Sequence, residues 1–228
     1  MADDDILTGL PSALLIPERT ALLGIDMQRD FVQPEFPFGQ MIQERNPTGA
    51  NAYFQRVREL VIPNIQRLLE QGRVHGLCIA YTESGSLRHD GRDLPRRMRR
   101  HNDRSRRIMG TVIYPPFDDP TCRVDASVAP QAGELVVQKT TSGPLASTML
   151  DQTLRVLNVD TVIVTGVVTD VCVAQTTREF GDRDFDAIVV EDAGAALSDM
   201  RHKMALETIA RTFGTVASTN QVLKLLEG

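Results

Sequence analysis

The sequence predicts an α/β protein, a three-layer α/β/α sandwich built around a mostly parallel sheet of about six strands. From residue 134 onward, short apolar segments alternate with segments of helical periodicity, which is typical of parallel strands joined by helical crossovers. The apolar segments 20–26 and 161–166 are almost continuous, as expected of strands that are buried on both faces. The length of 228 residues lies in the range of a single α/β domain.

The first part of the chain is expected to supply an arm and two strands. A run of apolar residues at helical spacing predicts a helix that Gly72 ends, with a kink or break at Pro63. The stretch before this helix is rich in Pro, Gly, Gln and Asn, which predicts a loop. The elements expected here are an N-terminal arm (1–18), a strand (20–26), a loop (27–50), a helix (52–71) and a strand (74–82).

The second part is regular after a long, arginine-rich insertion at 83–134. A connection of this length usually has structure or a function of its own, and we expect a helix near 94–107. No repeat, low-complexity tract or linker is found, so residues 1–228 are expected to form a single domain. The further elements expected are strands at 135–139, 161–166, 187–191 and 215–217 and helices at 146–157, 170–181, 198–213 and the C-terminus.

The charge of the chain is unevenly distributed. The net charge is −5, yet the segment 88–107 holds nine arginines and three aspartates and so carries +6. The acidic balance of the whole chain argues against nucleic acid as a partner. The basic segment is interpreted as a solvated face or a subunit contact; the alternative is the binding of an anionic substrate or polyanion near this segment.

The cysteines and the hydropathy bear on the compartment. Three widely spaced cysteines, at 78, 122 and 172, form no disulfide framework and no C-x-x-C pair, which favours a reducing, cytoplasmic compartment. No apolar run approaches the roughly 20 residues of a membrane-spanning helix, and the N-terminus is acidic where a secretory signal would be basic. No membrane partner is therefore expected.

Three reactive side chains follow predicted strands. The carboxyl ends of parallel strands meet at one edge of a sheet, where ligands bind, and Asp26, Lys139 and Cys172 all fall at such ends. Asp26 and Lys139 are expected to pair, since each would otherwise be a buried, uncompensated charge. Cys172 is expected in the first turn of a helix capped by Thr169 or Asp170, where the helix dipole and a nearby lysine would lower the thiol pKa. From the residues alone, Cys172 is either an activated nucleophile or a packed small hydrophobe.

Three sequence motifs favour the first alternative, that Cys172 is an activated nucleophile. They are G-I-D-M-Q-R-D-F (24–31), K-T-T-S-G-P-L-A-S-T-M-L-D (139–151) and V-T-G-V-V-T-D-V-C-V (164–173). In this order they resemble the isochorismatase-like cysteine hydrolase family, which includes nicotinamidases, N-carbamoylsarcosine amidase, ureidoacrylate hydrolase and biuret hydrolase. The resemblance runs from about residue 20 to the C-terminus. It implies the isochorismatase-like hydrolase fold.

The resemblance also implies roles for individual residues. Asp26, Lys139 and Cys172 would form a catalytic triad. The Val167–Val168 peptide bond would be cis, and the backbone N–H groups of Val168 and Cys172 would form an oxyanion hole. Phe31 matches a family position that often lines the substrate pocket, with core packing as the alternative. Glu83, just past the second strand, is a further candidate for substrate binding, with a surface position as its alternative.

The function expected from this resemblance is that of a cysteine amidohydrolase. It would cleave the C–N bond of a small amide, carbamoyl or ureido compound through a thioester, releasing ammonia or an amine, without a cofactor and as a homodimer or homotetramer. The loop 32–41 lacks the Asp and His of the metal-dependent nicotinamidases, and the four histidines have no metal-ligand spacing, so no metal is expected. The alternatives are a vinyl-ether hydrolase of the isochorismatase type and a catalytically idle binding module.

Overall fold

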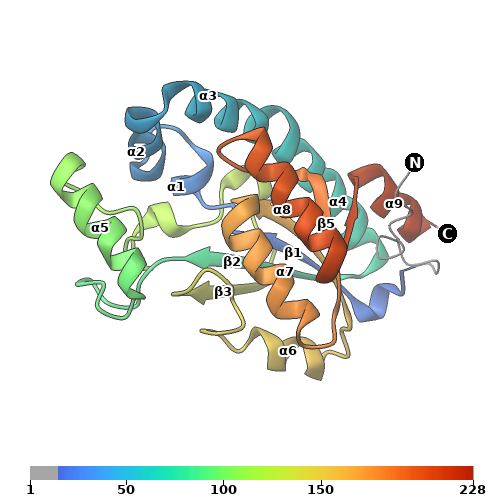
Figure 1. Ribbon diagram of the computed structural model, residues 1–228. Helices are drawn as coiled ribbons and strands as arrows, with labels where there is room; N and C mark the ends of the chain where they lie inside the picture. The colour runs from blue at the N-terminus through green and yellow to red at the C-terminus, as the bar shows by residue number, and fades with distance from the viewer. Residues whose placement is uncertain (1–14, 228) are drawn as a thin grey trace.

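Six parallel strands form one sheet in the computed structural model, which describes residues 15–227 (Figure 1). The strand order is β3-β2-β1-β4-β5-β6, so that β1 and β4 lie side by side at the centre. Every neighbouring pair is parallel. The strands are β1 (Thr20–Ile25), β2 (Cys78–Ser84), β3 (Leu135–Lys139), β4 (Thr161–Val167), β5 (Asp186–Ala195) and β6 (Thr215–Ala217).

Helices cover both faces of this sheet, which confirms the predicted three-layer fold (Figure 1). Two π-helical segments, Val57–Val61 and Thr169–Val173, run directly into α4 and α7. The α-helices are α1 (Arg29–Val32), α2 (Pro37–Arg45), α3 (Pro47–Arg56), α4 (Ile62–His75), α5 (Arg96–Met109), α6 (Leu150–Val156), α7 (Ala174–Gly181), α8 (Asp199–Thr212) and α9 (Thr219–Glu227). Short 3₁₀ turns occur at Pro17–Arg19, Pro120–Cys122 and Ala126–Val128.

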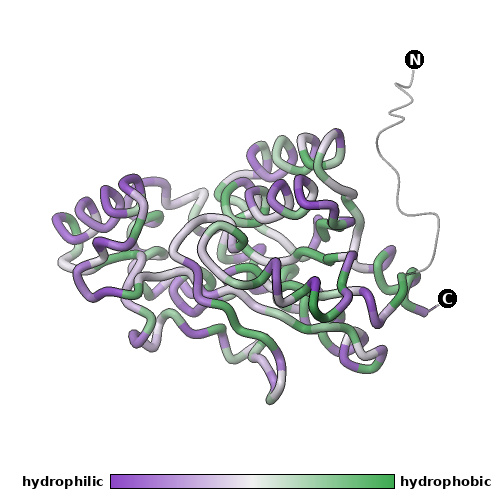
Figure 2. Tube along the Cα trace, turned by 90° about the horizontal axis from the view of Figure 1, so that it is seen from below, coloured by the Kyte–Doolittle hydropathy of each residue, from purple (hydrophilic) through white to green (hydrophobic). Residues whose placement is uncertain are grey.

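Two hydrophobic cores lie on the two sides of the sheet. Successive side chains of a strand point to opposite faces. Leu22 of β1 accordingly packs in the core below α3, α4 and α9, whereas Leu23 packs in the core below α6, α7 and α8. Figure 2 shows the strands as largely hydrophobic and α5 as almost wholly hydrophilic. The sheet is therefore buried on both faces, as its continuous apolar sequences predict.

The prediction of a loop over residues 27–50 is wrong. This stretch contains α1, α2 and the start of α3. Pro37 occupies the first turn of α2, where its missing N–H costs nothing, and Phe38, Met41 and Ile42 are buried at the i, i+3, i+4 spacing of a helix face. These side chains belong to the same core as the strands, and this burial outweighs the poor helix propensity of the segment.

The predicted helix over 52–71 is in the structure the end of α3, a π-helical segment and the first part of α4. The irregularity is the π-helical segment Val57–Val61, while Pro63 lies in the first turn of α4 and breaks nothing. The helix ends at Gly76, whose φ of 75° is left-handed, and Gly72 lies inside α4. As a result β2 begins at residue 78 rather than at 74.

The insertion between β2 and β3 contains the helix that was expected near 94–107, which spans Arg96–Met109. The other predicted helices and strands agree with the structure to within a few residues at each end. The exception is α6, which was predicted over 146–157 and begins at Leu150. Of the expected arm, residues 1–14 lie outside the described part of the chain. None of the helices between residues 15 and 227 combines the length and apolar character needed to span a bilayer.

Candidate active site

Asp26 lies at the carboxyl edge of the sheet, directly after the central strand β1. It has a left-handed φ of 49° and is 1% exposed. The Thr82 hydroxyl donates to Asp26 Oδ1 at 2.5 Å and accepts from the Asp26 N–H at 3.1 Å. On the other side β4 passes at Gly166, where a Cβ atom would lie 2.1 Å from the carbonyl oxygen of Ile25. Only glycine permits so close an approach, which brings the end of β4 next to Asp26.

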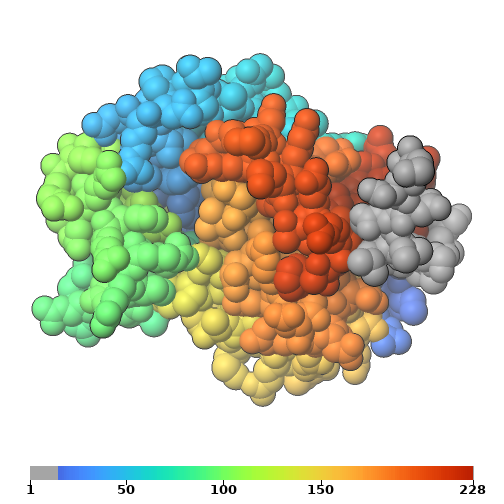
Figure 3. Space-filling model, viewed as in Figure 1, coloured from blue at the N-terminus to red at the C-terminus, as the bar shows by residue number. Residues whose placement is uncertain are grey.

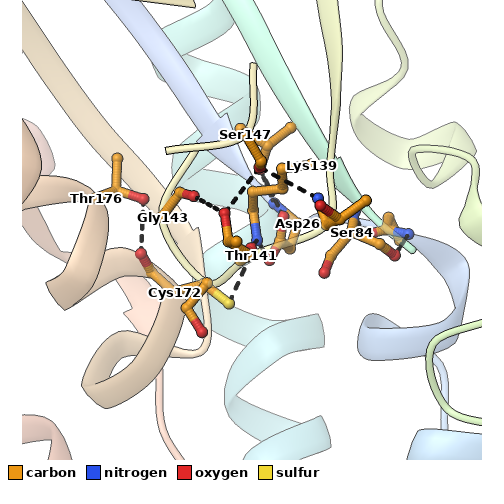
Figure 4. Close-up of polar contacts among 12 residues, drawn as sticks. Asp26, Ser84, Lys139, Thr141, Gly143, Ser147, Cys172 and Thr176 are labelled. Atoms are coloured by element: carbon orange, nitrogen blue, oxygen red, sulfur yellow. Dashed lines mark hydrogen bonds and ion pairs between the residues drawn. The ribbon is translucent and has the colours of Figure 1, made fainter. Parts of the chain in front are cut away.

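Lys139, the last residue of β3, connects Asp26 with Cys172 (Figure 4). Its Nζ lies 2.8 Å from Asp26 Oδ2, 3.6 Å from Cys172 Sγ and 3.1 Å from the Thr141 carbonyl oxygen. Burial by itself would lower the pKa of Lys139, but the negative charge of Asp26 and its hydrogen bond hold it above its usual value. The ammonium group is therefore charged, and the expected pairing of Asp26 with Lys139 is present.

Cys172 lies in the π-helical segment Thr169–Val173, which leads into α7. The expected cap is absent: the segment follows Val168, which has no side-chain cap, and the Thr169 hydroxyl instead contacts His202 Nδ1 at 2.9 Å. The thiol is nevertheless in the first turn, close to the ammonium of Lys139.

The expected lowering of the Cys172 pKa is wrong. Burial and the neighbouring Asp26 carboxylate raise the pKa of Cys172 to about 12, and the opposing charge of Lys139 does not compensate for burial. The thiol is thus protonated at neutral pH. A nucleophilic thiolate at this position has to be generated by transfer of the proton to a base, and Asp26 is the carboxylate beside it.

Two of the three side chains reach one cavity of about 550 Å³ beyond the carboxyl ends of β1 and β4, and the fully buried Lys139 lies behind them. Asp26 and Cys172 line it, together with Val167 and Val168, whose connecting peptide bond is cis. This is the position at which open parallel sheets bind their ligands. The volume is that of a small-molecule site.

Phe31 lies in the wall of this cavity and also packs on Phe38, with ring centroids 5.1 Å apart, so both interpretations of this residue apply. Glu83 is not among the lining residues. Its carboxylate accepts from Arg123 at 3.0 Å, from the Val124 N–H at 3.3 Å and from Gln138 at 3.1 Å, which fastens the insertion to β2. The structure therefore places Glu83 away from this cavity, and since its carboxylate is buried, the alternative of a surface position is also wrong.

Several lining residues escaped the sequence prediction. They come from α2, from α5 and from the segment after α5: Phe38, Met41, Ile42, Arg45, Arg97, His101, Ile113 and Tyr114. The spacing of Phe38, Met41 and Ile42 after Pro37 was a recognisable helix pattern. The position of α5 beside α2 is a tertiary contact that no local pattern reveals.

The other two cysteines have different surroundings. Cys78 is the first residue of β2, and Cys122 is buried below the Pro115 and Pro116 carbonyl groups, so neither lines the cavity. Among residues 15–227, no three His, Cys, Asp or Glu side chains come together in an arrangement that would hold a metal ion.

The fold and this site define the chain as an α/β protein with a cysteine, a lysine and an aspartate at the carboxyl edge of a parallel sheet. The chain belongs to the isochorismatase family, because the family model of the isochorismatase domain matches residues 20–221. It is accordingly a hydrolase of that family, and it has relatives named as amidases.

Two relatives and one solved structure illustrate the similarity. N-carbamoylsarcosine amidase of an Arthrobacter species is 26% identical over 209 residues, which cover 92% of this chain and 72% of the relative. Ureidoacrylate amidohydrolase RutB of Methylobacterium radiotolerans is 26% identical over 228 residues, 93% of this chain and 81% of the relative. The crystal structure of a cysteine hydrolase from Pseudomonas syringae pv. phaseolicola superposes with a TM-score of 0.79 at 27% identity, over 96% of this chain and 98% of that one.

Proposed function

We propose that this chain is a cysteine amidohydrolase that cleaves the C–N bond of a small amide, carbamoyl or ureido compound. The observation that carries the proposal is the contact of Lys139 Nζ with both Asp26 Oδ2 and Cys172 Sγ, two residues that line one cavity. A base, a cation and a nucleophile in mutual contact are what acyl transfer through a covalent intermediate requires. The names of the amidase relatives point to the same class of bond.

The first half-reaction transfers the acyl group to sulfur. Asp26 takes the proton of the Cys172 thiol as the sulfur attacks the carbonyl carbon. The backbone N–H groups of Val168 and Cys172 donate to the oxyanion that forms. The C–N bond then breaks, Asp26 returns the proton to the leaving nitrogen, and ammonia or an amine departs, leaving a thioester on Cys172.

The second half-reaction restores the thiol. Asp26 takes a proton from a water molecule, whose oxygen attacks the thioester carbonyl. The C–S bond breaks, the acid is released, and the proton goes to Cys172. Lys139 pairs with the Asp26 carboxylate and offers its ammonium to the developing thiolate, so that the raised pKa of the resting thiol does not prevent attack.

The proposal is tested by ammonia release from a panel of amide, carbamoyl and ureido compounds. Activity should be lost in Cys172→Ala and in Asp26→Asn. The control Cys78→Ala, which removes a thiol in the sheet outside the cavity, should release ammonia at the rate of the wild type. Activity that persists in Cys172→Ala would remove the covalent mechanism. Turnover of vinyl ethers alone would favour the isochorismatase-type reaction, and no turnover with retained ligand binding would favour the binding module. A cytoplasmic homodimer or homotetramer stays a prediction.

A further inference from the structure

The cavity has a strongly cationic mouth above an apolar wall. Three arginines line it, Arg45 at the end of α2, Arg97 on α5 and Arg201 at the start of α8, and all three are exposed. None of them forms an ion pair with a carboxylate of residues 15–227. The carboxylates of the lining are Asp170 and Asp26, and Asp26 is already neutralised by Lys139. The site therefore has an excess of positive charge that the protein itself does not balance.

Arg45 and Arg97 converge from two helices. The helices α2 and α5 are in contact, and His101, which also lines the cavity, lies one helical turn after Arg97 on the same face of α5. Partial burial and the charges of Arg97, Arg45 and Arg104 lower the pKa of His101 below its usual value. Figure 3 shows the α5 region, in green, as a flank of the molecule beside the blue α2 region.

The cavity-facing side of α5 is held in place. The Asn102 side chain donates to the Tyr114 carbonyl and accepts from the Tyr114 N–H, both at 3.0 Å, and the His101 ring stacks on the Tyr114 ring at 6.4 Å. Arg97 also donates to the Ser142 hydroxyl. The Arg97 guanidinium is thus held by Ser142 on an anchored helix, which lowers the entropy cost of binding an anion there.

The interior between this mouth and the sulfur is apolar. Phe31, Phe38 and Ile113 line it, and each is almost fully buried. A ligand that fills the cavity therefore meets three environments: the Cys172 thiol, an apolar wall and the arginines of the mouth, of which Arg45 and Arg97 come from the two helices in contact.

We infer that the substrate is an amide or ureido acid with an apolar side group, and that Arg45 and Arg97 bind its carboxylate at the cavity mouth. Arginine matches a carboxylate with two parallel hydrogen bonds, which makes these two residues specificity-determining rather than catalytic. The inference rests on the proposed function for the reaction that follows, but the binding it describes is measurable without turnover. It also gives part of the arginine-rich insertion a role at the site.

The test uses the full chain with Cys172→Ala, so that binding is measured without hydrolysis, and two probes: N-carbamoyl-phenylalanine and its neutral amide, N-carbamoyl-phenylalaninamide. By calorimetry the acid should bind about a hundredfold more tightly than the amide, about tenfold for each arginine. Arg45→Gln and Arg97→Gln should each weaken binding of the acid about tenfold, the lower end of the effect of losing a charged hydrogen bond, and leave binding of the amide unchanged. Arg100→Gln is the matched control, since it removes the same charge from the same helix outside the cavity.

The inference would be overturned if the acid and the amide bound equally well, or if neither bound. It would also be overturned if Arg45→Gln and Arg97→Gln weakened the binding of both probes equally, or if Arg100→Gln weakened the binding of the acid as much as they do. Ammonia release by the wild type distinguishes a failure of the carboxylate-binding inference from a failure of the proposed amidohydrolase function. Hydrolysis of neutral ureas without preference for acids would leave the amidohydrolase standing and refute the carboxylate site. Binding of the acid as predicted, without hydrolysis of any compound, would refute the amidohydrolase and leave the carboxylate site.

Discussion

Removal of the Lys139 ammonium is the perturbation whose size follows most directly from the structure. Asp26 is 1% exposed and Lys139 is fully buried, with 2.8 Å between their charged atoms. In Lys139→Met the buried Asp26 carboxylate would keep only the hydrogen bond from the Thr82 hydroxyl. An uncompensated buried charge of this kind costs about 3–5 kcal/mol. For a chain of this size the loss corresponds to a fall in Tm of about 6–20 °C.

The assay is urea unfolding at pH 7, with two comparison variants. Arg58→Met removes a cation from the exposed Arg58–Glu59 pair and should cost less than about 1 kcal/mol. The double variant Asp26→Leu, Lys139→Met removes both charges and should recover most of the stability lost in Lys139→Met. A Lys139→Met protein within about 1 kcal/mol of the wild type would refute the reasoning. A double variant as unstable as the single one would assign the loss to packing instead.

Three further predictions concern titrating groups. Because the pKa of Cys172 is raised to about 12, its alkylation by iodoacetamide, followed by peptide mass, should be slow at pH 7 and rise about tenfold per pH unit to pH 10; a plateau by pH 8 would show a low-pKa thiolate. Burial lowers the pKa of His202 to about 4, so between pH 6.5 and 4 the unfolded chain binds a proton at this residue and the folded chain does not. The free energy of unfolding of the wild type should therefore fall by about 2–3 kcal/mol relative to His202→Gln over this range. Parallel pH profiles of the two proteins in urea unfolding would contradict this. Burial raises the pKa of Asp30 to about 7, so the folded chain gains stability from the protonated carboxyl near pH 4 and loses that gain as the pH rises through 7. The free energy of unfolding of Asp30→Asn, relative to that of the wild type, should therefore increase by about 2–4 kcal/mol from pH 4 to 8. A difference that stays constant with pH would contradict this.

The meeting of Asp26, Lys139 and Cys172 was predictable because it depends on sheet topology. In a parallel sheet all strands end at one edge, so residues that follow separate strands become neighbours whatever the loops between them do. The register pairs Ile25 with Thr82 and with Gly166, which places the ends of β1, β2 and β4 level with one another.

The errors arose where the answer depends on side-chain direction or on burial. Thr82 and Glu83 are successive residues of β2, so one points to Asp26 and the other to the opposite face, a choice that the sequence position alone does not make. The pKa of Cys172 depends on how deeply the completed fold buries the thiol, which outweighs the neighbouring cation. The wall formed by α2 and α5 brings residues some 50 positions apart into contact, and only the tertiary structure shows this.

The central claim is that the Cys172 sulfur bonds to the substrate carbonyl carbon. The most direct test is acid quenching of the wild type during steady turnover of a substrate found by ammonia release, followed by intact and peptide mass measurement. A covalent intermediate should add the mass of the acyl group to the peptide that contains Cys172, and leave the peptides with Cys78 and Cys122 unchanged. Turnover with unmodified Cys172, together with undiminished turnover in Cys172→Ala, would contradict it.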